Sequence, residues 1–301
     1  MKKLLALLLA LAMLLSLCAC GTSDTDSEDS EDNKSSKTEG KATDTSPETV
    51  TFEEVVVVDS AECLIKVTGV NNDDFQGYSL DVYAENRSSD KKYTFSVDSA
   101  AINGVNCSTY YYETVEPGKK SNKSIAFLDD DLERYGLGAY TDIELSFRVS
   151  DSEDWFADDV ANESVHIYPY GEAKATKFVR QAQPGDKVLV DNNDVTVIAT
   201  GFGMREYWGY CADLYVVNKT DRTLGFSAED ASLNDFMTDA FLDIEYVDAG
   251  NSTFGSVIWS ESEMEANNIT DVTDMEFTLR AYDVEDWYSD DVLNAVITIT
   301  P

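Results

Sequence analysis

The sequence predicts an all-β protein built from two tandem β-sandwiches, and three observations support this. First, the chain repeats itself at an offset of 132 residues: VDSAECLIKVTGV from Val58 matches VDNNDVTVIATGF from Val190. Second, apolar and polar residues alternate in the segments 143–149 and 275–281, the period-two pattern of strands with one buried face. Third, turn residues recur at roughly every 8 to 12 positions, the spacing typical of a sandwich.

The chain begins with the features of a secretion signal. Lys2 and Lys3 precede an apolar run, residues 4–15, that is too short to cross a bilayer with ease. The run leads into LCAC, residues 17–20, which resembles the bacterial lipobox. That resemblance implies cleavage of a signal peptide, 1–19, and a diacylglyceryl group on the sulfur of Cys20, and two acyl chains suffice for stable anchoring. We therefore expect a lipoprotein on the extracellular face of the cell membrane. The alternative is an ordinary signal peptide with an incidental cysteine.

A polar segment separates this end from the repeats. Residues 21–50 are rich in Ser, Thr, Asp, Glu and Lys and hold no aromatic side chain, so they cannot bury enough apolar area to offset the entropy of ordering. We expect residues 20–50 to form a disordered acidic tether with an end-to-end distance of roughly 30 Å. The whole chain carries 22 basic and 58 acidic residues, a net charge of −36. This charge opposes binding to nucleic acid and to anionic lipid surfaces, and it permits cation binding.

Two copies of one domain fill the rest of the chain. We place the first copy at 51–169, a linker at 170–185 and the second copy at 186–301. Each copy is long enough to bury a core of its own. Cys63 aligns with Val195, so we expect it to be a small core residue, and the aligned sequons at Asn86 and Asn218 are expected to be strand-end turns.

One short helix is expected to interrupt each copy. DDDLERYGL begins at Asp129 and ESEMEANNI begins at Glu261, with acidic residues in the first turn, where the helix dipole favours them. Gly136 and Asn268 follow as C-terminal capping residues. A calcium site at the three adjacent aspartates from Asp129 is the alternative to a helix cap.

The lipobox, the acidic tether and the doubled β-domain together resemble two-domain lipoproteins of Gram-positive anaerobes. The repeat unit, with its VDNNDVTV, NKT and VDAGNS segments, is similar to an immunoglobulin-like domain of unknown function found in such lipoproteins. It is also similar in type to the small secreted immunoglobulin-like antigens of mycobacteria. The resemblance implies tandem immunoglobulin-like β-sandwich domains and an envelope location, and it transfers no catalytic or binding residue.

An acidic turn with a tryptophan occurs once in each copy. DSEDWFADD, residues 151–159, and DVEDWYSDD, residues 283–291, each follow the clearest strand and precede a final one. We expect hairpin loops whose aspartates bond their own backbone two residues on, and whose tryptophan folds back onto the sandwich edge. Calcium loops or paired catalytic carboxylates are the alternatives. The candidate cation ligands are Asp151, Glu153 and Asp154 in one loop and Asp283, Glu285 and Asp286 in the other.

Aromatic residues that the repeat does not require are the candidate binding surface. Tyr207 and Trp208 precede a strand whose first-copy counterpart follows NNDDFQ, and the run Tyr110, Tyr111 and Tyr112 has no tyrosine run opposite it in the second copy. Such residues suit contact with a protein or a glycan. Packing in the core or on a sheet face is the alternative.

The sequence disfavours catalysis. His166 is the one histidine and is expected to point outward from a strand, and no second histidine exists for a triad or a zinc site. We therefore predict a non-enzymatic binding or adhesion module without a cofactor. Its expected partners are membrane lipid, through the acyl groups of Cys20, and an envelope protein or glycan. The alternatives are a spacer or assembly subunit of an envelope complex and a calcium-binding or glycan-active protein.

Overall fold

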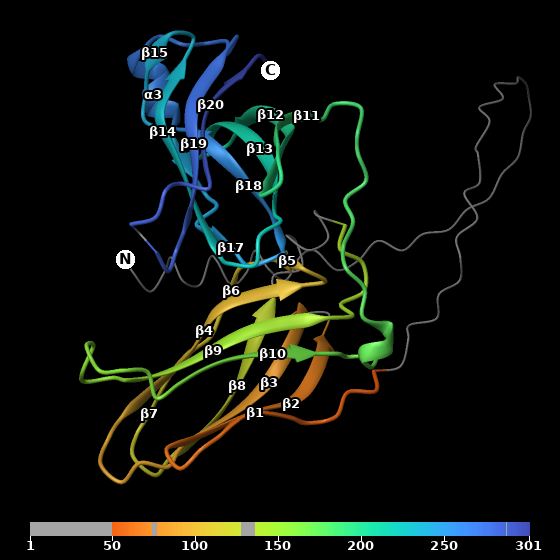
Figure 1. The fold of residues 1–301 in the computed structure, drawn as a ribbon, viewed down its shortest axis with the longest axis vertical. Helices are drawn as coiled ribbons and strands as arrows, with labels where there is room; N and C mark the ends of the chain where they lie inside the picture. Colours follow the sequence, from red (N-terminus) through yellow and green to blue (C-terminus); the bar gives the residue numbers. More distant parts are fainter. Residues whose placement is uncertain (1–49, 74–76, 128–135, 287) are drawn as a thin grey trace, which may run out of the picture. The chain divides into compact units, whose positions relative to one another are not determined.

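A computed structural model describes residues 50–73, 77–127, 136–286 and 288–301 (Figure 1). The described residues belong to one compact unit of antiparallel sheets that form an all-β sandwich fold, so the expected fold class is confirmed. The signal peptide, Cys20, the tether, the helix expected from Asp129 and Trp287 lie outside the described residues. Among the described residues, no helix is long and apolar enough to span a membrane.

The first copy forms two layers of strands. Its strands are β1 (Val55–Asp59), β2 (Cys63–Asp73), β3 (Gly77–Asn86), β4 (Tyr93–Ile102), β5 (Val105–Asn106), β6 (Thr109–Tyr110), β7 (Tyr112–Val115), β8 (Lys120–Phe127), β9 (Ile143–Asp151) and β10 (Ala161–Ile167). One layer has the order β1-β2-β3-β8-β6. The other has the order β10-β9-β4-β5, with β7 also paired to β4.

The second copy repeats this arrangement. Its strands are β11 (Lys187–Asp191), β12 (Val195–Arg205), β13 (Gly209–Asn218), β14 (Leu224–Leu233), β15 (Phe236–Met237), β16 (Phe241–Leu242), β17 (Tyr246–Val247), β18 (Ser252–Trp259), β19 (Met275–Asp283) and β20 (Leu293–Ile299). One layer is β15-β14-β19-β20, with β17 on β14, and the other contains β18-β13-β12-β11, with β16 on β18.

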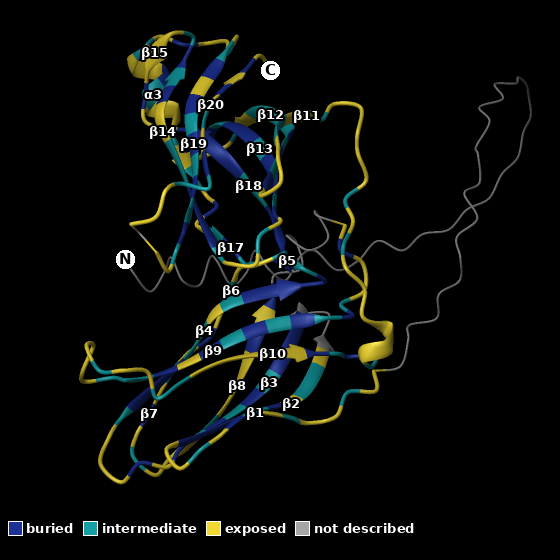
Figure 2. Cartoon of the chain, in the orientation of Figure 1, coloured by how far each residue is buried: buried dark blue, intermediate teal, exposed yellow. Residues whose placement is uncertain are grey.

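Each copy has a hydrophobic core that its alternating strands supply. In β9 the side chains of Ile143, Leu145, Phe147 and Val149 are all fully buried, and Cys63 lies in the same cluster, as the sequence predicts. A second cluster contains the matching residues of β19 and the fully buried Trp259. Figure 2 shows the result as strands that alternate between buried and exposed positions. The period-two pattern therefore assigns the buried face correctly in both copies.

Two aligned asparagines close the same turn in each copy. Asn86 and Asn218 are both fully buried. The Nδ2 of Asn86 donates to the carbonyl of Val115 at 2.9 Å, and the Nδ2 of Asn218 donates to the carbonyl of Val247 at 2.9 Å. A buried carbonyl without such a partner would cost free energy, so these amides stabilise the strand ends.

The helix expected in the second copy is present as α3 (Glu261–Ala266). Ser260 caps it, because its side chain accepts a hydrogen bond from the backbone N–H of Glu263. Asn268 adopts a left-handed φ of 54° just beyond its end, as a C-terminal capping residue does.

The two copies are joined through β5 and β18, which pair in parallel at Val105 and Ser252 and link two layers into one ten-stranded sheet (Figure 1). The linker contains the short helix η1 (Glu172–Lys174) and runs beside this junction, where the N–H of Phe178 donates to the carbonyl of Asn103 at 2.7 Å. Phe178 packs at 6.0 Å from the ring of Phe254, and Arg180 forms an ion pair with Asp186 at 2.6 Å.

Candidate functional site

The first acidic turn closes on its own backbone. The N–H of Glu153 donates to Oδ1 of Asp151 at 3.0 Å, and the N–H of Phe156 donates to Oδ1 of Asp154 at 3.1 Å. The second turn repeats both bonds, from Glu285 to Asp283 at 2.9 Å and from Tyr288 to Asp286 at 3.2 Å. The aspartates therefore act as the sequence predicts, each bonding the backbone two residues on.

Ion pairs engage further carboxylates of these loops. In the first loop, Lys91 approaches Asp151 at 3.1 Å and Arg148 approaches Asp159 at 2.8 Å. The corresponding pairs of the second loop are Arg222 with Asp283 at 3.1 Å and Arg280 with Asp291 at 2.9 Å. The hydrogen bond from the N–H of Glu153 is the largest cause that lowers the pKa of Asp151, and the hydrogen bond from the Lys91 ammonium is the second. Within the described ranges, no group of three or more His, Cys, Asp or Glu side chains is placed to hold a metal ion.

The aromatic residues at the first loop tip point into solvent. Trp155 is 87 % exposed and Phe156 is 100 % exposed, and Tyr288 in the matching position of the second loop is also fully exposed. Figure 2 shows the segment between β9 and β10 as largely exposed. The expectation that the tryptophan folds back onto the sandwich is therefore wrong for Trp155. The two aspartate turns complete their hydrogen bonds within the loop, so the tip extends past the sheet and the ring reaches no apolar face.

The tyrosine run of the first copy divides between surface and core. Tyr110 is 79 % exposed and Tyr112 is 53 % exposed, whereas Tyr111 is buried. The Tyr111 ring lies 6.2 Å from Phe147 in an edge-on contact, and burial raises the pKa of its hydroxyl. Because successive residues of an extended segment face opposite sides, only the outer two tyrosines remain candidates for binding, and Tyr111 is a core residue.

Tyr207 and Trp208 form the tip of the β12–β13 hairpin. They are 91 % and 58 % exposed, and Tyr207 has a left-handed φ of 69°. The turn is tight because the N–H of Trp208 donates to the carbonyl of Arg205 at 3.2 Å. A Cβ on Gly209 would lie 2.1 Å from the carbonyl oxygen of Trp259, so this position requires glycine.

The aromatic candidates are not gathered into one surface. The β12–β13 hairpin pairs Arg205 with Gly209 at its tip and Val195 with Asn218 at its other end. Asn218 is bonded to Asn251 in the turn that meets the first copy, so the tip is the end of the hairpin away from the junction. Tyr110 and Tyr112 belong to the first copy, and none of the contacts among the described residues joins them to Tyr207 or Trp208.

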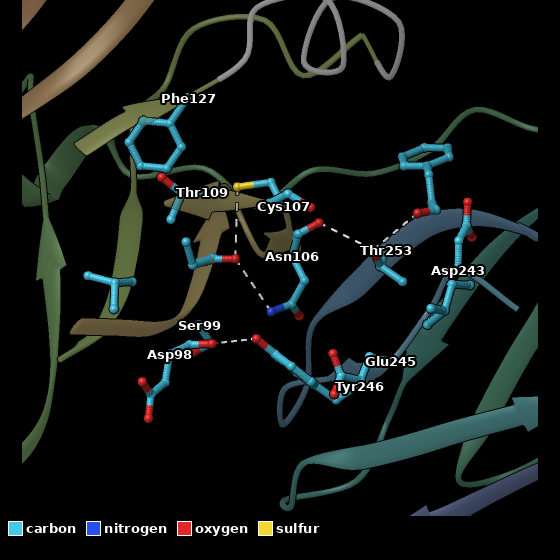
Figure 3. Close-up of a pocket in the computed structure, with 15 residues that line it drawn as sticks. Asp98, Ser99, Asn106, Cys107, Thr109, Phe127, Asp243, Glu245, Tyr246 and Thr253 are labelled. Atoms are coloured by element: carbon cyan, nitrogen blue, oxygen red, sulfur yellow. Dashed lines mark hydrogen bonds between the residues drawn. The ribbon is translucent and has the colours of Figure 1, made fainter. Parts of the chain in front are cut away.

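A cavity of about 280 Å³ lies at the junction of the copies (Figure 3). Its polar lining is largely paired within the wall: Oγ1 of Thr253 donates to the carbonyl of Asn106 at 3.2 Å, and the hydroxyl of Tyr246 donates to the carbonyl of Asp98. Burial, the largest cause, raises the pKa of Tyr246 to about 12. These bonds hold the junction, and sequence reasoning missed it. The available signal was a polar residue opposite an apolar one: the repeat slips by one residue near Phe95 and Phe226, so Asn106 aligns with Met237.

The three described cysteines form no disulfide: Cys63 and Cys211 are buried, and Cys107 is half-buried beside the cavity. His166 lies on the outer face of β10, with Nδ1 2.7 Å from Oδ1 of Asp142 and its ring stacked on Tyr168.

Comparisons with known proteins add little to the site. No protein-family model matches the sequence, and no curated protein matches it. Among solved structures, the YadV chaperone is 11 % identical, with 79 % of this chain and 100 % of that chain covered and a TM-score of 0.25. The SafA pilin of Salmonella enterica in complex with the SafB chaperone is 10 % identical, with 79 % of this chain and 97 % of that chain covered and a TM-score of 0.23. A protein of unknown function from Porphyromonas gingivalis W83 is 12 % identical, with 82 % of this chain and 97 % of that chain covered and a TM-score of 0.22. At these scores the similarities carry no argument about function.

Proposed function

We propose that this protein is a lipid-anchored extracellular lipoprotein that acts as a non-enzymatic binding or adhesion module and contacts its partner through exposed aromatic loop tips. The observation that carries the proposal is the full exposure of Phe156 and Tyr288 at matching positions of the two copies, with Trp155 beside the first. Exposed aromatic side chains of this size are the residues that most often dominate binding energy when a partner covers them.

The geometry of the loops supports this role. Each tip is held by two aspartate–backbone bonds and by an ion pair between an aspartate and a basic side chain of the neighbouring strand connection. A loop that is held in shape before binding loses less conformational entropy when it binds, which favours affinity. Tyr207 and Trp208 give the second copy a further aromatic tip of the same kind.

The location rests on the N-terminal sequence. An apolar signal followed by Leu17 and Ala19 before Cys20 supports lipid attachment at Cys20. Replacement Cys20→Ala should release the protein from the membrane fraction, whereas Cys18→Ala should leave it there, because two acyl chains are needed for a stable anchor. Equal membrane retention of the two variants would contradict lipid attachment at Cys20.

The binding role is tested with the full chain as bait against native envelope preparations. The triple variant Trp155→Ala, Phe156→Ala, Tyr288→Ala should lose affinity for the retained envelope component by about thirtyfold or more, the effect of ~2 kcal/mol at a binding hot spot. The matched control replaces two exposed valines that lie on strands, Val188 and Val296, with alanine, and it should bind like the parent chain. Protease and glycan-hydrolase treatment of the envelope distinguishes a protein partner from a glycan.

A spacer or assembly subunit is the second candidate, and the ten-stranded sheet across the junction favours it. A continuous sheet transmits load and fixes a distance without any soluble ligand. Unchanged retention of the triple variant would favour this role over binding through the loop tips.

A further inference from the structure

The junction between the copies joins two unlike surfaces. The first copy contributes an edge surface, residues 104–106 with Glu144 beside them, and the second copy contributes a turn surface, residues 248–252. The N–H of Ser252 donates to the carbonyl of Gly104 at 3.0 Å. Asn106 and Asp248 exchange two bonds, at 2.6 and 3.1 Å, and Nδ2 of Asn251 donates to Oε2 of Glu144 at 3.2 Å.

Both copies carry both surfaces, because the repeat reproduces the backbone of each. In the second copy the edge surface is residues 235–237 with Glu276. Phe236 and Met237 pair with Leu233 and Ser232 of β14 just as Val105 and Asn106 pair with Ile102 and Ala101 of β4. In the first copy the turn surface is residues 116–120, and its Gly118 has a φ of 66°, against 68° for the aligned Gly250. The junction uses one edge surface and one turn surface, so one of each is left over.

The unused edge surface is apolar and exposed. Phe236 is 49 % exposed and Met237 is 69 % exposed, whereas the aligned Val105 and Asn106 are buried by the junction. β15 is the last strand of its sheet, and such an edge presents unpaired backbone groups to another chain. The unused turn surface leaves a strand edge unpaired. Along its length β8 pairs with β3, but it pairs with β6 only at Ala126 and Phe127, so within the described ranges no second strand pairs with its Lys120 end.

The two unused surfaces are complementary in charge. Lys119 aligns with Asn251, and Glu276 aligns with Glu144. If the two unused surfaces met as the junction surfaces do, the Lys119 ammonium would lie beside the Glu276 carboxylate. In the junction the same place is occupied by the hydrogen bond from Asn251 to Glu144. Lys119 and Glu276 are both exposed in the structure. Lys119 is a local positive charge on a chain with a net charge of −36, so this pairing favours one orientation among many repulsive ones.

We propose that the turn surface of one molecule docks on the edge surface of a second molecule, so that copies of this chain associate head to tail. Such a contact is heterologous, and it extends into open chains of molecules unless the rotation closes a ring. It is weaker than the junction within the chain. There the linker residue Phe178 packs beside the rings of Tyr215 and Phe254, whereas the aligned positions in the first copy are Tyr83 and Asn122, so one of the two rings is replaced by an amide.

Sedimentation velocity of the full chain in detergent, over a concentration series at low ionic strength, tests the proposal. The wild type should show a mass that rises with concentration and falls when salt is added. Lys119→Glu and Glu276→Lys should each weaken association about tenfold or more, because each places like charges together. An equimolar mixture of the two variants should recover association, since the Glu276→Lys edge then meets the Lys119→Glu turn. A monomeric wild type at every concentration, or variants that associate like it, would overturn the proposal.

Cysteine cross-linking provides a second measurement that does not depend on affinity. Met237 and Glu116 align with Asn106 and Asp248, whose side chains touch in the junction. Met237→Cys and Glu116→Cys molecules, mixed under oxidation, should give a disulfide-linked dimer. The control pair Val188→Cys and Val296→Cys is equally exposed and should not cross-link. Equal yields from the two mixtures would show random collision and contradict the docking geometry.

Discussion

The two copies of the repeat share hydrogen bonds between aligned polar residues, and they differ at positions where one copy contacts the other. Oδ1 of Asn103 accepts from the backbone N–H and hydroxyl of Thr141 at 3.0 and 2.9 Å, and Oδ1 of Asn234 accepts from Thr273 in the same way at 2.8 and 3.0 Å. By contrast, the aligned Asn106 and Met237 are 8 % and 69 % exposed. In these two cases the matched pair supports the fold of both copies, and the unmatched pair marks a contact that only one copy makes.

The acidic turns complicate this comparison in a useful way. They match in their hydrogen bonds, and yet each ends in an aromatic residue that supports no core. Repetition alone therefore does not show that a residue is needed for folding. The proposed binding role rests on repetition together with exposure, and five sets of substitutions, in order of decreasing effect, test this distinction.

The largest effect is expected at the end of β8 and of β18, where Phe127 and Trp259 align and are almost completely buried. Phe127→Ala and Trp259→Ala should each lower the free energy of unfolding by about 3–5 kcal/mol. Trp259→Phe is the matched control and should cost less than Trp259→Ala, because it keeps an aromatic ring and installs the first-copy residue, so the cavity that it leaves is smaller. Denaturant unfolding also shows whether each variant shifts one transition or the whole molecule. Losses below about 1 kcal/mol for both alanine variants would contradict the burial of these two rings in the cores.

The next effect concerns the buried amides. Asn86→Ala and Asn218→Ala should each cost about 2–3 kcal/mol, because carbonyls of Val115 and Val247 lose their donors inside the protein. Asn162→Ala, at an exposed position of β10, is the control and should change stability by about 0.5 kcal/mol or less. Unequal costs of the two buried amides would show that the copies do not share this support.

A smaller effect separates the aligned residues of the two edge surfaces. Asn106→Ala should lower the free energy of unfolding by about 1–3 kcal/mol. The backbone N–H of Asp248 then loses its acceptor, Oδ1 of Asn106, and the Asp248 carboxylate loses its donor, Nδ2 of Asn106. Met237→Ala should change stability by about 0.5 kcal/mol or less in dilute solution. A double-mutant cycle of Asn106→Ala with Asp248→Ala measures the coupling energy between the two side chains. A coupling energy near zero would show that this contact does not stabilise the junction.

Trp155→Ala should leave the free energy of unfolding within about 0.5 kcal/mol of the parent, since the ring is 87 % exposed. A buried tryptophan would instead cost about 3 kcal/mol or more. Thermal unfolding decides between the two, and Phe156→Ala serves as the neighbouring control. A large loss for Trp155→Ala alone would restore the view that this ring covers the sandwich edge.

The smallest effect is a pH dependence of the acidic turns. The largest cause that lowers the pKa of Asp151 is the hydrogen bond from the backbone N–H of Glu153. For Asp283 it is the hydrogen bond from the backbone N–H of Glu285. A depressed carboxyl pKa contributes stability that is present above the unfolded value of about 3.9 and is lost as the pH falls through the folded pKa. Asp151→Asn and Asp283→Asn should therefore flatten the acid limb of the stability curve. An unchanged acid limb in both variants would contradict the turn bonds.

Much of the fold was accessible from the sequence. The alternation in β9 and β19, the burial of Cys63, the capping residue Asn268 and the aspartate turns all follow from local rules. Of the candidate binding residues, Tyr110, Tyr112, Tyr207 and Trp208 are exposed and Tyr111 is not. The period-two rule, applied to the tyrosine run, would have placed Tyr111 on the opposite face, but which face was the core depended on strands elsewhere in the chain.

The sequence by itself determined the repeat, the strand periodicity and the turn chemistry, because these depend on backbone hydrogen bonds and on residues a few positions apart. Only the tertiary structure decided that Trp155 stays in solvent and that Asn106 meets Asp248, 142 positions away. Loop-tip exposure and the contact between copies depend on which distant surfaces come together, and no local pattern encodes that. The same reason applies to the edge strand β15: its first-copy counterpart, β5, is covered by β18, and only the tertiary structure decides which of the two edges is covered.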